Sequence, residues 1–179
     1  MLRKVNILIT GAPGSGKSTL LQRVVERARH QGVRVGGIST PEFRLGNGRR
    51  GGFLIRNVLS GTEQTMAAVD IESPIRVGRY GVNLSAIRDV GVVAIRDAMT
   101  SADLILIDEI GKMELAVLEF QESVIMALDS SKPVLGTIGL QLRTPFVKQI
   151  KERNDITLLT LTLQNRSSLN SQISQLLGL

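Results

Sequence analysis

The feature that most constrains this chain is an octet, GAPGSGKS, that runs from Gly11 to Ser18. An apolar run, VNILIT, comes directly before it, and TLLQRVVERARHQG comes directly after it. A short apolar run is typical of a buried strand, and the second segment has the spacing of an amphipathic helix. The sequence therefore predicts a strand, a tight glycine-rich loop and a helix in direct succession.

The spacing of the octet, G-x-x-x-x-G-K-[ST], is that of a phosphate-binding P-loop. Gly11 and Gly16 fill the two glycine positions, and Gly14 adds further freedom, so that backbone N–H groups can converge on an anion. Lys17 can reach the β and γ phosphates, and the Ser18 hydroxyl can bind the magnesium ion that they carry. The alternative is a glycine-rich turn that only joins a strand to a helix.

Length and residue counts restrict the class of protein. A chain of 179 residues fits one domain, 1–179, with a sizeable core. No apolar run reaches the roughly 18 residues of a membrane span, so we expect a cytoplasmic protein. The apolar run near the N-terminus leads straight into the octet, so we expect it to form the first strand. The absence of cysteine excludes disulfides and thiolate metal sites, and a single histidine, His30, argues against an imidazole-built metal centre.

The chain is basic, with a formal net charge of +6 and a pI near 10.3. Such a charge is compatible with nucleic acid, membrane headgroups or a polyanionic small molecule. The basic residues are dispersed, and aromatic residues make up 3% of the chain with no Trp, so few side chains could stack on bases. We therefore expect no membrane partner, disfavour nucleic acid, and expect a monomer.

Strand-like and helix-like segments alternate along the rest of the chain. The expected strands are VRVGGIST, DLILID, KPVLGTI and DITLLTLTL, and the expected helices are LSAIRDVGVVAIRDAMTSA, LAVLEFQESVIMALD, TPFVKQIKERN and RSSLNSQISQLLG. This alternation predicts an α/β, three-layer fold with a mainly parallel central sheet flanked by helices, and a ligand at the carboxyl ends of the strands. PEFRLGNGRRGGFLIRNVLSG predicts a β-hairpin insertion with an arginine-bearing tip.

A second chemical signal is DLILIDEIGKMEL, Asp103 to Leu115. An apolar strand that ends in Asp108 has the form of a Walker B element, whose carboxylate holds magnesium opposite Ser18. Glu109 follows it and could orient and polarise a water for attack on the γ-phosphate. Thr137, at the end of another strand, could supply a hydroxyl beside that phosphate or be a plain strand-end threonine.

The motifs GAPGSGKSTL, TPEFRLGNGRRGGF, VGRYGVNL, IDEIGKMEL, LGTI and a late NR pair occur here in the order and spacing of a known family. In these motifs the chain resembles the THEP1-type nucleoside-triphosphatases, which are P-loop NTPases, from Val5 to about Leu169. The resemblance implies magnesium-dependent hydrolysis of nucleoside triphosphates to diphosphate and phosphate, with broad base preference and slow turnover. The implied substrates are ATP, GTP, CTP, UTP and TTP.

The resemblance also implies which residues form the site. It places the following residues around the nucleotide: Gly11, Ala12, Pro13, Gly14, Ser15, Gly16, Lys17, Ser18, Thr19, Asp108, Glu109, Ile110, Gly111 and Lys112. Lys112 could neutralise charge near the γ-phosphate or form a salt bridge within its segment, and Glu114 belongs to the same motif. Asn165 and Arg166 stand where similar proteins hold the base, although Asn165 or Ser167 could instead cap a helix.

An arginine that assists the transition state is expected, but several arginines could serve. Arg44 and Arg79 are the first candidates, because they lie in loop motifs rather than on a helix face, and Lys17 and Glu109 complete the predicted catalytic set. The remaining candidates are Arg49, Arg50, Arg143 and Arg166. The family often has a basic or polar loop after LGTI, whereas this chain has GLQL before Arg143.

Other functions share parts of this pattern. A nucleotide or small-molecule kinase would use the same P-loop and a mobile arginine lid. The segment Asp108 to Gly111 matches the D-x-x-G of GTPase switches, but no Asn-Lys-x-Asp motif for reading guanine is present. A non-catalytic RNA-binding module is disfavoured by the intact acidic pair.

The glycine-rich hairpin around GNGRRGG is also predicted to be a lid, mobile when empty and ordered by a triphosphate. Its arginines, Arg44, Arg49 and Arg50, are cations that we expect only a polyanion to draw inward. The alternative is a static surface turn with solvated arginines.

Overall fold

Five parallel strands form the centre of the computed structural model, which describes residues 2–179. Their order across the sheet is β10-β1-β9-β8-β2, so neighbouring strands are joined by crossovers. The strands are β1 (Asn6–Thr10), β2 (Val35–Ser39), β8 (Leu104–Ile110), β9 (Val134–Ile138) and β10 (Ile156–Thr160). The predicted mainly parallel central sheet is confirmed.

The other half of the same sheet is antiparallel. β2 pairs with β4, β4 with β5, β5 with β7 and β7 with β6, while β3 pairs with β4 off this path. These strands are β3 (Glu42–Arg44), β4 (Arg50–Asn57), β5 (Glu63–Ala68), β6 (Arg76–Val77) and β7 (Tyr80–Val82). The predicted hairpin is β3 and β4, but it is part of a larger five-stranded extension that the sequence did not predict as a unit.

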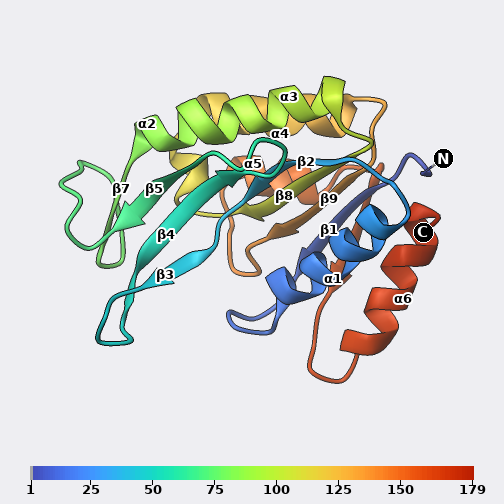
Figure 1. Ribbon diagram of the computed structural model, residues 1–179, viewed down its shortest axis with the longest axis horizontal. Helices are drawn as coiled ribbons and strands as arrows, with labels where there is room; N and C mark the ends of the chain where they lie inside the picture. The colour runs from blue at the N-terminus through green and yellow to red at the C-terminus, as the bar shows by residue number, and fades with distance from the viewer. Residues whose placement is uncertain (1) are drawn as a thin grey trace.

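Helices cover both faces of the sheet and complete three layers (Figure 1). On one face lie α1 (Lys17–His30) and α6 (Arg166–Leu177), which contact each other. The other face is covered by α2 (Leu84–Ala86), the π-helix η1 (Ile87–Val92), α3 (Val93–Ser101), the 3₁₀ helix η2 (Glu114–Ala116), α4 (Leu118–Asp129) and α5 (Pro145–Lys151). None of the helices in residues 2–179 is long and apolar enough to cross a membrane.

Burial explains which apolar runs became central strands. Every residue of β1 and of β9 is buried, as expected for parallel strands with helices on both faces. β10 was also expected to be a buried strand, but its residues are only partly buried or exposed. The reason is its place at the edge of the sheet, where β1 is its one neighbour.

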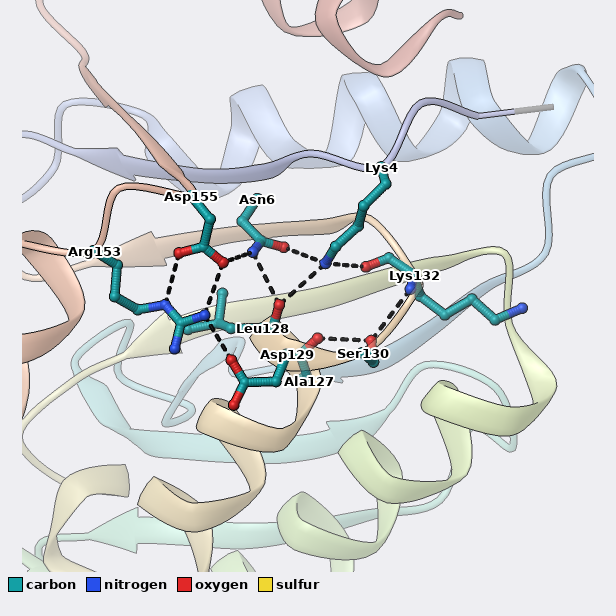
Figure 2. A network of polar contacts seen from close by, with 9 residues as sticks. All are labelled: Lys4, Asn6, Ala127, Leu128, Asp129, Ser130, Lys132, Arg153 and Asp155. Atoms are coloured by element: carbon teal, nitrogen blue, oxygen red, sulfur yellow. Dashed lines mark hydrogen bonds and ion pairs between the residues drawn. The ribbon is translucent and has the colours of Figure 1, made fainter.

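A polar network closes the end of the sheet at which β1 begins (Figure 2). The buried Asn6 amide donates to the Leu128 carbonyl, at 3.0 Å, and to the Asp155 carboxylate, at 2.9 Å. Arg153 pairs with both Asp155 and Asp129. These contacts tie the start of β1 to the end of α4 and to the segment before β10. The opposite end of β1 leads into the octet that starts at Gly11, so the network lies away from the predicted site.

Candidate active site

The octet forms a tight loop between β1 and α1, as predicted. Gly16 is the N-cap of α1 and has φ 94°, a left-handed conformation that side chains disfavour. A Cβ atom on Gly11 would lie 2.7 Å from the Leu161 carbonyl oxygen, so that position also requires glycine. The loop and the N-terminus of α1 therefore have the form of an anion-binding cradle.

Lys17 folds back over this loop. Its ammonium donates to the carbonyl oxygens of Gly11, at 3.1 Å, and Ala12, at 3.2 Å. The Ser15 hydroxyl in the same loop is buried and has no hydrogen-bond partner among the described residues. A cation held by two carbonyls and an unpartnered buried hydroxyl in one small loop fit a site for an anion.

The late NR pair lies against the loop as well. The guanidinium of Arg166 donates from two nitrogens to the Ser15 carbonyl oxygen, at 2.6 and 3.0 Å, and lies beside Gly16. Asn165 does not cap α6 through its side chain: it accepts from the Thr162 N–H and donates to the Thr160 carbonyl. Arg166 therefore supports the phosphate loop, while Asn165 shapes the turn before α6.

Asp108 lies near the carboxyl end of β8, and three hydroxyls lie close to it. Thr137 of β9 donates to its Oδ1 at 2.6 Å, and the Ser18 side chain also hydrogen-bonds to it. Thr40 donates to its backbone carbonyl at 2.9 Å. Burial raises the pKa of the Asp108 carboxyl, against the hydrogen bonds from Thr137 and Ser18 and the charge of Lys17, which lower it.

Ser18 and Asp108 fit a magnesium site of the kind predicted. Mg²⁺ takes oxygen ligands and in phosphate sites uses one or two protein groups besides water and phosphate oxygens. A hydroxyl and a carboxylate in hydrogen-bond contact beside an anion cradle match that donor set. Among the described residues, no cluster of three or more Asp, Glu, His or Cys side chains could hold a metal ion, so water and phosphate oxygens would supply the remaining ligands.

Glu109 follows Asp108 and is half-buried. The pairing of β8 with β9 is interrupted between Ile107 and Ile110, so neither acidic residue pairs with β9, although Asp108 pairs with Ser39 of β2. The peptide bond between Asp108 and Glu109 is cis. Burial raises the pKa of Glu109, Lys17 lowers it and Asp108 raises it. Lys17 of the phosphate loop is thus near enough for its charge to favour the ionised form of Glu109.

The remaining residues of the acidic motif, from Ile110 to Glu114, lie partly in the core and partly at the surface. The Ile110 side chain is fully buried in the core, so only its backbone can face a ligand. Lys112 lines a cavity of about 400 Å³ together with Leu142 and Arg143. Glu114 is 2% exposed and lies beside Gly111 and Glu109, an arrangement that its exposed-looking sequence context did not predict.

Arg44 and Arg79 are held within the antiparallel extension rather than at the phosphate loop. Arg44 donates to the Gly48 carbonyl and pairs with Glu42, which also pairs with Arg50. Arg79 donates to the Arg50 carbonyl and the Tyr80 hydroxyl. Glu42 of β3 pairs with Arg44 on its own strand and with Arg50 on β4, and both pairs lie at the surface. That a polyanion draws the hairpin arginines inward stays a prediction.

The chain is similar to known proteins over nearly its whole length. A family model described as NTPase matches residues 6–174. The nucleoside-triphosphatase THEP1 of Thermofilum pendens is 43% identical over 171 residues, covering 95% of this chain and 93% of that protein. The protein of the same name from Thermotoga maritima is 42% identical over 173 residues, covering 97% and 95%.

Two solved structures are similar over nearly their whole length. The crystal structure of THEP1 from Aquifex aeolicus has a TM-score of 0.84 and 34% identity, covering 97% of this chain and 99% of that one. The solution structure of a human cancer-related nucleoside triphosphatase has a TM-score of 0.80 and 35% identity, covering 97% and 96%.

Proposed function

The chain belongs to the NTPase family of the THEP1 proteins and hydrolyses nucleoside triphosphates, and from that premise we propose that it does so with magnesium, at the loop Gly11–Thr19 and the acidic pair Asp108–Glu109. The observation that carries this proposal is the geometry of the phosphate loop, where Lys17 lies on the carbonyls of Gly11 and Ala12 at the N-terminus of α1. The buried Asp108 carboxylate, held by Thr137, adds the acidic group that the proposed metal site needs. A cation, a metal-binding pair and a base meet at one anion cradle.

Each residue has a role that its contacts support. Lys17 exchanges the carbonyls of Gly11 and Ala12 for phosphate oxygens, which are stronger acceptors because they are charged. Ser18 and Asp108 would hold the magnesium ion, which neutralises charge on the phosphates. Thr137 holds the Asp108 carboxylate by donating to its Oδ1.

Glu109 is the proposed general base. The water oxygen forms a bond to the γ-phosphorus while the bond from that phosphorus to the bridging oxygen breaks, and the water proton passes to Glu109. The raised pKa of Glu109 suits this role, because a more basic carboxylate accepts a proton more readily. The products are nucleoside diphosphate and inorganic phosphate.

We propose broad base preference, with ATP, GTP, CTP, UTP and TTP as substrates. The Asn165 side chain accepts a hydrogen bond from the Thr162 N–H and donates one to the Thr160 carbonyl. Its amide oxygen and nitrogen are therefore both engaged and do not select one base. We further propose a single domain, 1–179, since both hydrophobic clusters pack on one sheet. We also propose a cytoplasmic location, where nucleoside triphosphates are available, and a monomer.

The test is phosphate release from each of the five nucleotides in ¹⁸O-labelled water, with and without magnesium. We expect magnesium-dependent release at similar rates for all five, with one ¹⁸O in each phosphate. Asp108→Asn should raise the magnesium concentration that half-maximal activity requires. Transfer of phosphoryl to an added alcohol or nucleotide instead of water would identify a kinase and contradict the proposal.

A further inference from the structure

The guanidinium of Arg166 is directed at a backbone atom rather than at an acid. None of the ion pairs in residues 2–179 includes Arg166. Two of its nitrogens donate instead to the Ser15 carbonyl oxygen, Nη2 at 2.6 Å and Nε at 3.0 Å. A hydrogen bond from a charged donor is stronger than one between neutral groups. Two such bonds therefore fix the direction of this one carbonyl in the phosphate loop.

The Ser15 carbonyl needs a partner of this kind. Ser15 is 8% exposed, and a buried carbonyl without a hydrogen bond is costly. The helical hydrogen bonds of α1 begin one residue later, where the Gly16 carbonyl accepts from the Leu20 N–H at 2.9 Å. The Ser15 carbonyl thus stands outside the hydrogen-bond ladder of α1, and Arg166 is the group that satisfies it.

The turn before α6 brings Arg166 to the phosphate loop. β10 pairs with β1, and directly after β10 the Leu161 N–H donates to the carbonyl of Thr10, the last residue before the loop, at 2.7 Å. Asn165 closes the turn through both groups of its side-chain amide. Arg166 follows as the first residue of α6. Backbone contacts on both sides of the turn therefore determine where this guanidinium lies.

One planar peptide group joins Ser15 to Gly16. This peptide is trans, so its C=O and N–H groups point in opposite directions. Because the carbonyl points toward Arg166, the Gly16 N–H points away from Arg166. Gly16 is the N-cap of α1, where N–H groups have no helical partner, and its N–H makes no backbone hydrogen bond within residues 2–179. This N–H is therefore available to an anion.

Glycine makes the reverse orientation of this peptide accessible. Gly14 and Gly16 have φ 72° and 94°, and glycine adopts both signs of φ at little cost. After a rotation of the peptide, the Ser15 oxygen would face a bound anion in place of the Gly16 N–H. That oxygen carries a partial negative charge, which would repel phosphate. The contact with Arg166 opposes this rotation.

We propose that Arg166 is a positioning residue that fixes the Ser15–Gly16 peptide, so that the Gly16 N–H faces the phosphates of the nucleotide. This inference rests on the proposed phosphate site at Gly11–Thr19. It gives Arg166 a role distinct from holding the base and from assisting the transition state. The N–H binds phosphate before and during the reaction alike, so its orientation affects KM rather than kcat.

The test compares two substitutions that match arginine as far as its Nε atom. Arg166→Gln has an amide nitrogen where Nε lies and keeps that donor, whereas Arg166→Met has the same length without a donor. In Arg166→Met, KM and the dissociation constant of a magnesium-bound, non-hydrolysable triphosphate should rise about 10- to 100-fold, as for loss of a hydrogen bond to a charged group. In Arg166→Gln both should stay within about five-fold, and kcat within about three-fold in either variant.

Arg27→Gln and Arg27→Met are the matched controls, since Arg27 is exposed on α1, away from the loop. Both should bind and turn over like the wild type. Wild-type affinity in Arg166→Met would overturn the proposal. Equal losses in Arg166→Gln and Arg166→Met would also overturn it, because both lack the charge and only one lacks the donor. A fall in kcat at unchanged KM would do the same. Circular dichroism establishes that each variant is folded.

The orientation of the peptide can also be measured without nucleotide. In protein labelled with ¹⁵N-glycine, relaxation dispersion should detect exchange at the Gly16 amide in Arg166→Met, but not in the wild type or in Arg166→Gln. A Gly16 amide free of exchange in Arg166→Met would contradict the proposal. If Lys17→Ala binds triphosphate as tightly as the wild type, it is the phosphate site that is wrong, so the two failures can be told apart.

Discussion

Replacing Glu114 by Gln should make the protein less sensitive to alkaline pH. The pKa of this carboxyl is about 8 in the folded protein and near 4.5 when the chain is unfolded. Between these two values the folded state binds more protons than the unfolded state, so the free energy of unfolding falls as pH rises. The stabilising contribution of the neutral acid is complete below pH 4.5 and is lost progressively up to about pH 8.

The size of the effect follows from the linkage relation. For these two pKa values the contribution of Glu114 declines by roughly 3 to 4 kcal/mol between pH 5 and pH 8. The carboxyl is fully buried, so screening by solvent does not reduce this figure as it does for surface groups. Asp108 and Glu109 also have raised pKa values and act in the same direction, but they are present in both proteins.

The assay is urea unfolding of the wild type and Glu114→Gln at half-unit steps from pH 5 to pH 8.5. The two free energies of unfolding should be within about 1 kcal/mol at pH 5, and the variant should be more stable by about 3 kcal/mol at pH 8. Glu122→Gln, on the surface of α4, should follow the wild type throughout. A constant difference between wild type and Glu114→Gln at all pH values would refute the assignment of a neutral buried acid.

Three further predictions concern the phosphate loop, the polar network and the hairpin. Lys17→Ala should abolish phosphate release and weaken triphosphate binding, whereas Lys148→Ala, at an exposed position, should do neither. Unchanged hydrolysis in Lys17→Ala would rule out the P-loop as the site. Asn6→Leu removes a buried amide with three hydrogen-bond partners, so it should lower the free energy of unfolding by about 2 kcal/mol without changing kcat. The control Asn154→Leu, at an exposed position, should change that free energy by less than about 0.5 kcal/mol, and equal stability of the two variants would refute the role of the network. Amide hydrogen exchange over residues 43–53 should slow when a non-hydrolysable triphosphate and magnesium are added, and less with diphosphate; equal protection in the empty and loaded states would refute the lid.

The parallel half of the sheet could be predicted because its signals are local. The buried runs that became β1, β2, β8 and β9 are short, and a helical pattern follows β1, β8 and β9. The antiparallel half was harder to predict, since β6 and β7 are two and three residues long and carry no alternation that a pattern could detect. Their pairing depends on contacts between segments rather than on the residues of either segment.

The site shows the same division between local and long-range information. The octet and the acidic pair could be predicted because a fixed spacing specifies their geometry. The contact of Arg166 with the Ser15 carbonyl joins residues 151 positions apart, and no local pattern encodes it. The burial of Glu114 was likewise not predictable, because a glutamate two residues after a lysine has the composition of an exposed turn. The ion pair of Glu42 with Arg50 was missed for the same reason, since it depends on the pairing of β3 with β4.

The measurement that tests the account most directly separates binding from chemistry at Glu109. Glu109→Gln keeps the size of the side chain but removes the base, so the dissociation constant of the magnesium–triphosphate complex should stay within about three-fold of the wild type. Phosphate release in a single turnover should fall by about 10²- to 10⁴-fold. Single-turnover release at the wild-type rate, or a loss of binding as large as the loss of rate, would contradict the claim that Glu109 activates the water at this phosphate loop.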